Sequence, residues 1–349
     1  MWHTAYSFQQ HPNWGLHARP LEQEAADLLA STSLAACLST LEIIRVTGAD
    51  ALTFLQGQTT CDFREVSEGH PRLGAHCNAK GRVQASFRAF HQDGDFLLLV
   101  PKGQGEPTRA ALAKFALFSK ATLSLDTTLA PLALLGPQAA DWAKALFGAT
   151  PTPGDCAANE NGLITTLETD RLLALVPSGR CESVIKRLQA LNATLAGDNV
   201  WWLAEIRAGI AQIPVEQNEQ WIPQEINYDL VDGVNFKKGC YKGQEIVARI
   251  HYRGQTKVRA FPVNIEPVQI EPAQIDPAQS STGIIPGTRI VDAAGHNIGT
   301  LLNIAYVNGT TLRGMAVLKT DASESETLRL EPNDGCHVRP LPLPYAINN

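Results

Sequence analysis

Hydrophobic positions in the first 254 residues follow two spacings, one typical of helices and one of strands. Leu21, Ala25 and Leu28 recur on one helix face, which predicts a helix over 21–40, whereas residues 41–47 alternate as in a strand. The same spacings predict further strands at 72–78, 82–91, 95–100, 121–125, 132–136, 162–168 and 171–177. They predict further helices from residue 50 onward and over 105–120, 138–147 and 181–191. Because strands and helices alternate irregularly, with hairpins, the pattern favours an α+β fold over a doubly wound sheet.

The pattern changes after about residue 254, where helical spacing ends. Short segments separated by Gly and Pro turns predict strands at 256–265, 288–292, 298–307, 311–319 and 336–340. Such a series is typical of a small antiparallel β-barrel. Within it a pentapeptide with one proline occurs three times in succession, which predicts a solvated loop over 265–280.

Length and composition indicate a globular protein of more than one part. The chain has 349 residues, of which 44% are hydrophobic and 18% charged, so it can bury a core and has room for about two domains. Residues 1–20 are polar and lack periodicity, which predicts a loose leader. We expect an α+β region of two similar halves over 21–254, with a break near 126–131, and the barrel over 255–349.

Charge limits the partners that the whole chain can attract. The net charge of −6 argues against nucleic acid and anionic membranes, and the longest apolar runs are far too short to span a bilayer. Residues 237–259 are different, because seven Lys or Arg and one Glu give them a local charge of +6 against −12 for the remainder. This segment is a candidate anion site, while membrane association and direct nucleic acid binding are not expected.

Cysteine usage indicates free thiols in a reducing compartment. The seven cysteines are odd in number and include no C-x-x-C, which argues against a disulfide framework and a zinc ribbon. Residues 1–16 show no basic stretch followed by an apolar run, so a signal peptide is not expected. We therefore expect a cytoplasmic protein.

Cys240 differs from the other cysteines in its neighbours. Gly239 and Gly243 leave room around it, and residues 242–250 can form a helix that would begin near the sulfur. Exposed N–H groups and nearby lysines would favour a thiolate there. The alternative is a small buried cysteine in a glycine turn. The other six cysteines fit a role as core filler.

The segment Lys-Gly-Cys-Tyr-Lys-Gly-Gln-Glu, residues 238–245, resembles the signature of the YgfZ family, which is related to the T-protein of the glycine cleavage system. Further similarity lies at 46–50, 56–58, 75–81, 115–120, 208–210, 222–225 and 340–345. The resemblance implies a duplicated α+β folate-binding region closed by a C-terminal antiparallel β-barrel. It also implies tetrahydrofolate, or another reduced folate, as ligand, and support of iron–sulfur proteins such as tRNA-modifying enzymes.

The resemblance also implies roles for single residues. Cys240 is the functional thiol, for which nucleophile, transient cluster ligand and redox sensor are alternative roles. The residues that accompany it are Lys238, Gly239, Tyr241, Gly243, Gln244 and Glu245. One motif cysteine cannot supply the four ligands of a stable iron–sulfur cluster, so no resident metal is expected.

Folate requires a flat apolar surface for its pterin, polar groups for the pterin edge and cations for its glutamate tail. The family places two tryptophans at this site. One of them matches Trp201, and the other falls at Leu41. The resemblance implies further folate contacts from Asn78, Lys80, Gln224, Arg249 and Arg253. Trp201 and Trp202 also fit a role as core anchors, because adjacent residues face different ways.

The T-protein branch carries an acidic pair just after the glycine of the first hairpin. Here residues 81–86 read Gly-Arg-Val-Gln-Ala-Ser, with no carboxylate to act as a base. We therefore expect an accessory protein that acts through Cys240. A folate-dependent one-carbon transferase of the aminomethyl type is the alternative, and a plain interaction protein is a third hypothesis.

Overall fold

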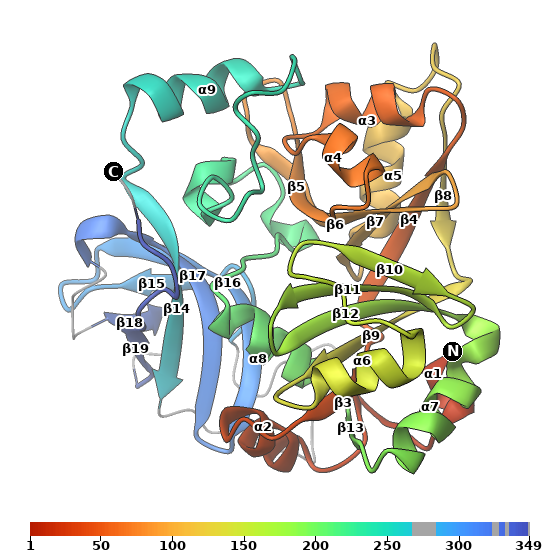
Figure 1. Cartoon of the computed structure of the whole chain (residues 1–349). Coiled ribbons are helices and arrows are strands. Elements are labelled where there is room, and N and C mark those ends of the chain that lie inside the picture. Colours follow the sequence, from red (N-terminus) through yellow and green to blue (C-terminus); the bar gives the residue numbers. More distant parts are fainter. Residues whose placement is uncertain (267–283, 323–327, 332–334, 348–349) are drawn as a thin grey trace. The chain divides into compact units, whose positions relative to one another are not determined.

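The computed structural model describes residues 1–266, 284–322, 328–331 and 335–347, and the chain folds into two compact units (Figure 1). Unit 1 comprises Met1–Leu52, Phe63–Arg72 and Arg88–Trp201. Unit 2 comprises Thr53–Asp62, Leu73–Phe87 and Trp202–Asn349. Two short segments from the first quarter of the chain thus fold with its C-terminal part, so the units do not meet at a single boundary near residue 254.

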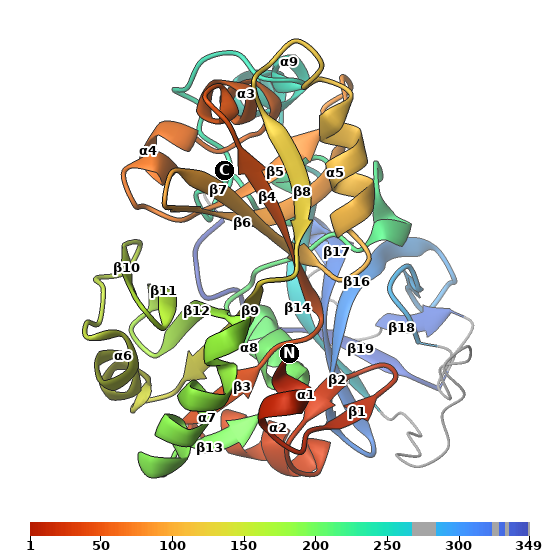
Figure 2. The ribbon, with the colours of Figure 1, turned by 90° about the vertical axis from the view of Figure 1, so that its right-hand side faces the viewer.

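Unit 1 contains a six-stranded sheet with two helices on one face (Figure 2). The strand order is β10-β11-β12-β9-β3-β13. The strands are β3 (Leu34–Cys37), β9 (Leu129–Leu135), β10 (Cys156–Asn159), β11 (Gly162–Glu168), β12 (Arg171–Pro177) and β13 (Thr194–Ala196). The helices are α6 (Ala139–Phe147) and α7 (Cys181–Ala190). Alternate residues of β9, such as Leu132 and Leu134, join Trp142 and Ile185 of the helices in one hydrophobic core.

A second sheet has the strand order β5-β6-β7-β4-β8. Its strands are β4 (Leu41–Thr47), β5 (Arg72–Cys77), β6 (Val83–Gln92), β7 (Asp95–Pro101) and β8 (Thr122–Asp126). The helices in this stretch of chain are α3 (Ala51–Gln58), α4 (Phe63–Ser67) and α5 (Gly105–Ala113). Between Phe87 and Arg88, within β6, the chain passes from unit 2 to unit 1. In chain order the last strand of this sheet, β8, ends at Asp126, and the chain enters β9 of the six-stranded sheet at Leu129.

Residues 1–20 are structured, so the expectation of a loose leader is wrong. They form α1 (Trp2–Ala5) and a hairpin of β1 (Gln9–His11) with β2 (Gly15–His17). Trp2 is buried, and its Nε1 donates a hydrogen bond to the carbonyl oxygen of Pro131 at 3.0 Å. The aromatic and apolar side chains that anchor this segment are spaced irregularly, so the sequence shows no periodic signal.

Two helices are shorter than the sequence predicts. The helix expected over 21–40 is α2 (Leu21–Leu29), and Ser31 then takes a φ of +60°, which a right-handed helix cannot contain. Residues 34–37 instead form β3, which pairs with β9 and β13. The helix expected over 105–120 is α5, which also ends early. In the first case strand pairing overrides a local preference for helix.

Unit 2 contains a closed six-stranded barrel, drawn in blue and cyan in Figure 1. The strand order is β14-β17-β16-β15-β18-β19. The strands are β14 (Val258–Glu266), β15 (Arg289–Val291), β16 (Asn297–Asn308), β17 (Thr311–Lys319), β18 (Leu328–Glu331) and β19 (His337–Pro340). The expected antiparallel barrel is confirmed. The sequence does not predict β18, whose four residues are too few to show alternation. The loop expected over 265–280 lies, from residue 267 onward, outside the described residues.

The remaining helices are α8 (Asp198–Arg207), α9 (Gln244–Arg253) and the short 3₁₀ segments η1 (Ser178–Arg180), η2 (Val215–Gln217), η3 (Pro223–Ile226) and η4 (Thr320–Ala322). Mixed sheets and helices followed by a barrel confirm the α+β fold class. Across the part of the chain that the structure describes, no helix has both the length and the apolar character needed to cross a membrane.

Candidate functional site

Cys240 lies in an exposed loop of unit 2, residues 235–243, which we call the Cys240 loop. The side-chain oxygen of Asn235 begins the loop by accepting hydrogen bonds from the backbone N–H groups of Lys237 and Lys238, at 2.8 and 3.0 Å. A Cβ built on Gly239 would meet no atom within 4 Å. The thiol therefore stands on open surface, as the flanking glycines predict, and the alternative of a buried cysteine is wrong.

Lys238 fixes the Cys240 loop to the body of unit 2. Its side chain is buried, and its Nζ donates hydrogen bonds to the carbonyl oxygens of Thr59 at 2.8 Å and Cys61 at 2.5 Å. The ammonium group also lies 5.3 Å from the ring centre of Tyr241. The sequence assigns Lys238 to the electrostatic field around the sulfur, whereas its contacts make it an anchor of the loop.

Helix α9 begins at Gln244, later than the predicted start at residue 242. The cause is Gly243, whose φ of +85° cannot belong to a right-handed helix. A Cβ on Gly243 would also lie 2.5 Å from the carbonyl oxygen of Asn78. Gly243 is thus required both for the turn and for the close approach of the β5–β6 hairpin. Cys240 consequently stands four residues before the helix, and the side-chain oxygen of Gln244 accepts a hydrogen bond from the backbone N–H of Tyr241 at 3.4 Å.

Three groups in or near the Cys240 loop are buried and un-ionised at neutral pH. Burial raises the pKa of the Cys77 thiol to about 12, with Lys242 opposing the shift, and it also raises the pKa of Tyr241. Burial lowers the pKa of His76 to about 4, so its imidazole is neutral. His76 Nδ1 pairs with the carbonyl oxygen of Gln58 at 2.8 Å. These three side chains therefore add no charge to the Cys240 loop.

The other cysteines contrast with Cys240. Cys37, Cys61, Cys77 and Cys181 are buried, and Cys156 and Cys336 are partly buried. Burial raises the pKa of Cys156 to about 12 and that of Cys181 to about 11, and it raises the pKa values of Cys37 and Cys336 as well. A thiol with a raised pKa is almost entirely protonated at neutral pH and reacts slowly.

Five of the predicted folate contacts lie in unit 2, and two of them hold backbone. The side-chain oxygen of Asn78 accepts hydrogen bonds from the N–H groups of Lys80 and Arg82, at 2.9 and 3.0 Å, and so shapes the hairpin turn. Gln224 is buried and donates to the carbonyl oxygen of Val247 in α9 at 2.7 Å. These contacts give Asn78 and Gln224 structural roles, while the side chain of Lys80 is exposed.

The two arginines predicted for folate lie on α9. Arg249 pairs with Glu245 one turn earlier at 2.7 Å, and both side chains are largely exposed. Arg253 is exposed at the last position of the helix. Exposed pairs of this kind contribute little to stability, so both arginines are available to a ligand or partner.

Trp201 is enclosed in unit 1. Its side chain is only 1% exposed, and the guanidinium carbons of Arg88 and Arg171 each lie 5.9 Å from its ring centre. Its Nε1 has no hydrogen-bond partner among the described residues. These surroundings match the alternative of a core anchor, because an enclosed ring offers no free face to a pterin.

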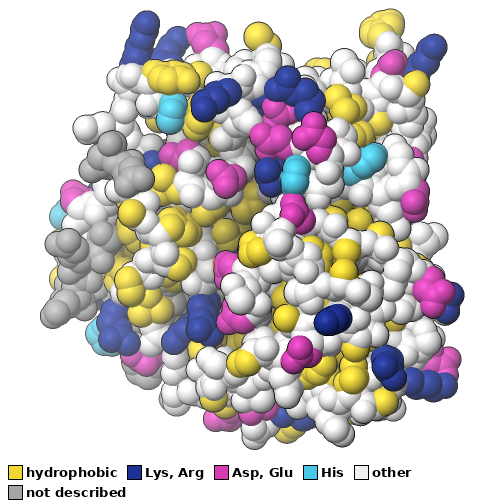
Figure 3. Space-filling model, viewed as in Figure 1, with side chains coloured by type: hydrophobic (Ala, Val, Ile, Leu, Met, Phe, Trp, Pro, Cys, Tyr) yellow, Lys and Arg dark blue, Asp and Glu magenta, His cyan; other side chains and the backbone are white. Residues whose placement is uncertain are grey.

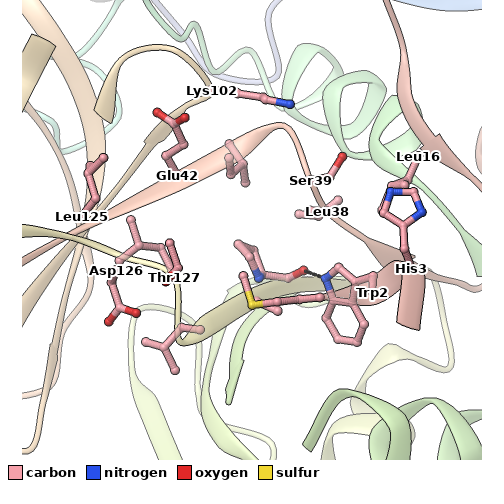
Figure 4. Close-up of a pocket in the computed structure, with 16 residues that line it drawn as sticks. Trp2, His3, Leu16, Leu38, Ser39, Glu42, Lys102, Leu125, Asp126 and Thr127 are labelled. Atoms are coloured by element: carbon pink, nitrogen blue, oxygen red, sulfur yellow. Dashed lines mark hydrogen bonds between the residues drawn. The ribbon is translucent and has the colours of Figure 1, made fainter. Parts of the chain in front are cut away.

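Leu41 lines a cavity of about 270 Å³ in unit 1, which we call the Leu41 cavity (Figure 4). Its walls are mainly apolar and include Trp2, Leu38 and Leu129. Figure 4 shows Lys102, Ser39 and His3 along one side of it and Leu125, Asp126 and Thr127 across from them. The cavity therefore combines an apolar wall with polar and charged groups.

Asp198 holds the chain beside this cavity. Its buried carboxylate accepts five hydrogen bonds of 2.6–2.9 Å, from the backbone N–H of Leu16 and from both the N–H and the hydroxyl of Ser39 and Thr40. These contacts fix the residues that directly precede Leu41. Sequence reasoning missed Asp198, and it also missed the cavity, because the leader was expected to be loose.

The seven predicted folate contacts do not form one cluster within either unit. Leu41 and Trp201 belong to unit 1, and Trp201 does not line the Leu41 cavity. The signature residues, by contrast, are gathered in unit 2 around the Cys240 loop. Among the residues placed by the structure, no group of three or more His, Cys, Asp or Glu side chains has an arrangement that could hold a metal ion.

Comparisons with known proteins identify relatives of this chain in sequence and in fold. Residues 1–153 match the family model described as the GCVT N-terminal domain. The tRNA-modifying protein YgfZ of Photobacterium profundum is 31% identical over 313 residues, covering 88% of this chain and 90% of that protein. Its counterpart from Aliivibrio fischeri is 28% identical over 311 residues, covering 88% and 91%. The crystal structure of the glycine cleavage system aminomethyltransferase T from Bartonella henselae matches with a TM-score of 0.72 at 16% identity, covering 97% of this chain and 93% of that one. This last match shows the fold alone.

Proposed function

Since this chain belongs to the YgfZ family of tRNA-modifying proteins, we propose that it is a folate-binding accessory protein that supports iron–sulfur enzymes in the cytoplasm. Through those enzymes it would support tRNA modification. Its working group is the thiol of Cys240. Its ligand is tetrahydrofolate or another reduced folate.

The observation that carries the proposal is the exposure of Cys240, in contrast to the other thiols. It is the exposed cysteine of the chain, and it stands on a loop anchored by the buried Lys238. Five of the other six cysteines have a raised pKa. A thiol that must meet a cluster or a partner protein needs access first, and the Cys240 loop provides it.

The Leu41 cavity supports the folate part of the proposal. A volume of about 270 Å³ suits a pterin ring, with the rest of the folate extending past the rim. Leu41 and Leu129 would cover the faces of the ring, and Glu42 would accept hydrogen bonds from its edge. Lys102 would pair with a carboxylate of the glutamate tail. Bound folate supplies a one-carbon carrier, whereas the residues here bind and orient it.

The alternative of an aminomethyl-type transferase is not favoured. At the positions that carry carboxylates in the T-protein branch, Gln84 donates a hydrogen bond to Glu219 at 2.7 Å and Ala85 is buried. Neither side chain can act as a base. The similarity to the aminomethyltransferase concerns fold.

Competitive alkylation tests the proposal. Under limiting iodoacetamide at pH 7, peptide mass spectrometry should find Cys240 labelled at least tenfold faster than any other cysteine, because thiols with raised pKa values are protonated. Cys240→Ser should abolish iron–sulfur-dependent tRNA modification in cells, while Cys336→Ser, a change at a partly buried thiol, should retain it. Equal labelling of Cys240 and Cys336, or full activity of Cys240→Ser, would refute the proposal.

A further inference from the structure

The basic segment 237–259 divides into an internal and an external set of charges. Lys238 and Arg259 are buried, and Arg259 pairs with Asp229 at 2.6 and 3.0 Å. Lys242 is half-buried. The cations that remain on the surface are Lys237, Arg249, Arg253 and Lys257. Figure 3 shows Lys and Arg side chains gathered over α9 at the top of the view. The positive charge of this segment is therefore concentrated on one helix and its ends.

Three aromatic rings stand among these cations. The rings of Phe236 and His251 are stacked, with centres 3.6 Å apart and planes 12° from parallel. Tyr252 meets His251 edge-on at 4.7 Å, and 67% of its side chain is exposed. The rings lie outside the hydrophobic core, so core packing does not account for this grouping. We call these three rings, with the four surface cations, the α9 surface.

A groove of about 840 Å³ lies where the chain passes from α9 into β14. Lys257, Lys319 and Asp321 are its charged lining residues, and Gln255 and Thr256 add polar side chains. Because Tyr252 is only three residues from Gln255, the groove continues the α9 surface along the chain. The α9 surface and the groove together combine aromatic rings with a lysine-lined groove.

We propose that the α9 surface and this groove bind an unpaired segment of RNA. Cations in a groove follow a phosphate backbone, and exposed rings offer stacking faces to unpaired bases. An acidic peptide would match the lysines but would leave the rings without a role, so RNA fits the whole surface better. The net charge of −6 argues against this partner only for the chain as a whole. The proposal goes beyond the accessory function and requires neither folate nor the Cys240 thiol.

Fluorescence anisotropy with a labelled single-stranded RNA of about 12 nucleotides, within the usual range of site sizes, tests the proposal on the full chain. The wild-type protein should bind saturably, and binding should weaken as salt rises. Tyr252→Ala should weaken it about tenfold, the loss expected for one stacked base. The matched control is Phe118→Ala, which removes a fully exposed aromatic ring elsewhere in the chain and should change nothing. Replacing both Lys257 and Lys319 by Ala should lower the slope of log affinity against log salt by about 2.

Several results would overturn the proposal. These are a lack of saturable binding at low salt, equal affinity of Tyr252→Ala and wild type, and competition by a poly-glutamate peptide as strong as by unlabelled RNA. Duplex RNA that binds as tightly as the single strand would also overturn it, because paired bases cannot stack on the rings. Cys240→Ser should bind RNA like the wild type. The RNA assay can therefore fail or succeed independently of the accessory function.

Discussion

The Cys240 loop and the Leu41 cavity both depend on a buried charged side chain, but the two charges have opposite signs. Each is fixed by one buried charged side chain that forms hydrogen bonds with uncharged groups. In unit 2 the ammonium of Lys238 donates to two carbonyl oxygens, and in unit 1 the carboxylate of Asp198 accepts from five N–H and hydroxyl groups. The first arrangement presents a thiol to solvent, whereas the second encloses an apolar space. A buried charge thus specifies the local backbone conformation in both units, although one site exposes a thiol and the other encloses a cavity.

The largest effect on stability is expected from removing the carboxylate of Asp198. Asp198→Ala leaves five donors without their acceptor, at about 1–3 kcal/mol for each group that water cannot reach. We expect a loss of about 3–5 kcal/mol in the free energy of unfolding, measured by urea denaturation followed by circular dichroism. Asp141→Ala, at an exposed position of α6, should change it by less than about 0.5 kcal/mol. Matching denaturation midpoints for Asp198→Ala and wild type would contradict this role.

Removing the ammonium group of Lys238 should have a smaller effect on stability. Lys238→Met keeps the length of the side chain but leaves the carbonyl oxygens of Thr59 and Cys61 without the ammonium, which should cost about 2–3 kcal/mol. Its neighbour provides the control, because Lys237 is exposed and Lys237→Met should be close to neutral. Chemical denaturation of both variants distinguishes them. If the two lysines proved equally dispensable, the loop would have some other anchor.

The smallest effect concerns the cavity. Leu41→Trp adds an aromatic face to its wall and should tighten tetrahydrofolate binding roughly two- to tenfold, as measured by isothermal titration calorimetry. Leu117→Trp adds the same ring at an exposed position outside the cavity and should leave the dissociation constant unchanged. Weaker binding by Leu41→Trp, or the same gain in both variants, would place the pterin elsewhere.

The sequence predicts those elements whose stability depends on their own pattern. The segments that become β14, β16 and β17 appear with bounds within two residues, because turn residues such as Asn308 and Gly309 separate apolar runs of strand length. The exposure of Cys240 is also foreseen, since Gly239 and Gly243 are visible in the sequence. Local spacing suffices in these cases.

Elements that depend on distant partners are not predictable in this way. Residues 34–37 have a helix-forming composition but pair with β9, almost a hundred residues later. Trp201 is enclosed by Arg88 and Arg171, and no sequence pattern links these three residues. Similarly, nothing near Lys238 indicates that its charge is directed inward to Thr59. A contact over a long sequence separation leaves no local signal.

The interleaving of the two units has a consequence for synthesis on the ribosome. Thr59 and Lys238 are 179 residues apart, and Thr60 and Gly233 are 173 apart. At about 5–20 residues per second, the segment Thr53–Asp62 leaves the ribosome roughly 10–35 s before these partners are made. Until then the nascent chain cannot close the loop that positions Cys240. The thiol therefore takes up its final position only after about two thirds of the chain has been translated, and a chain that terminates before Lys238 lacks the anchored loop.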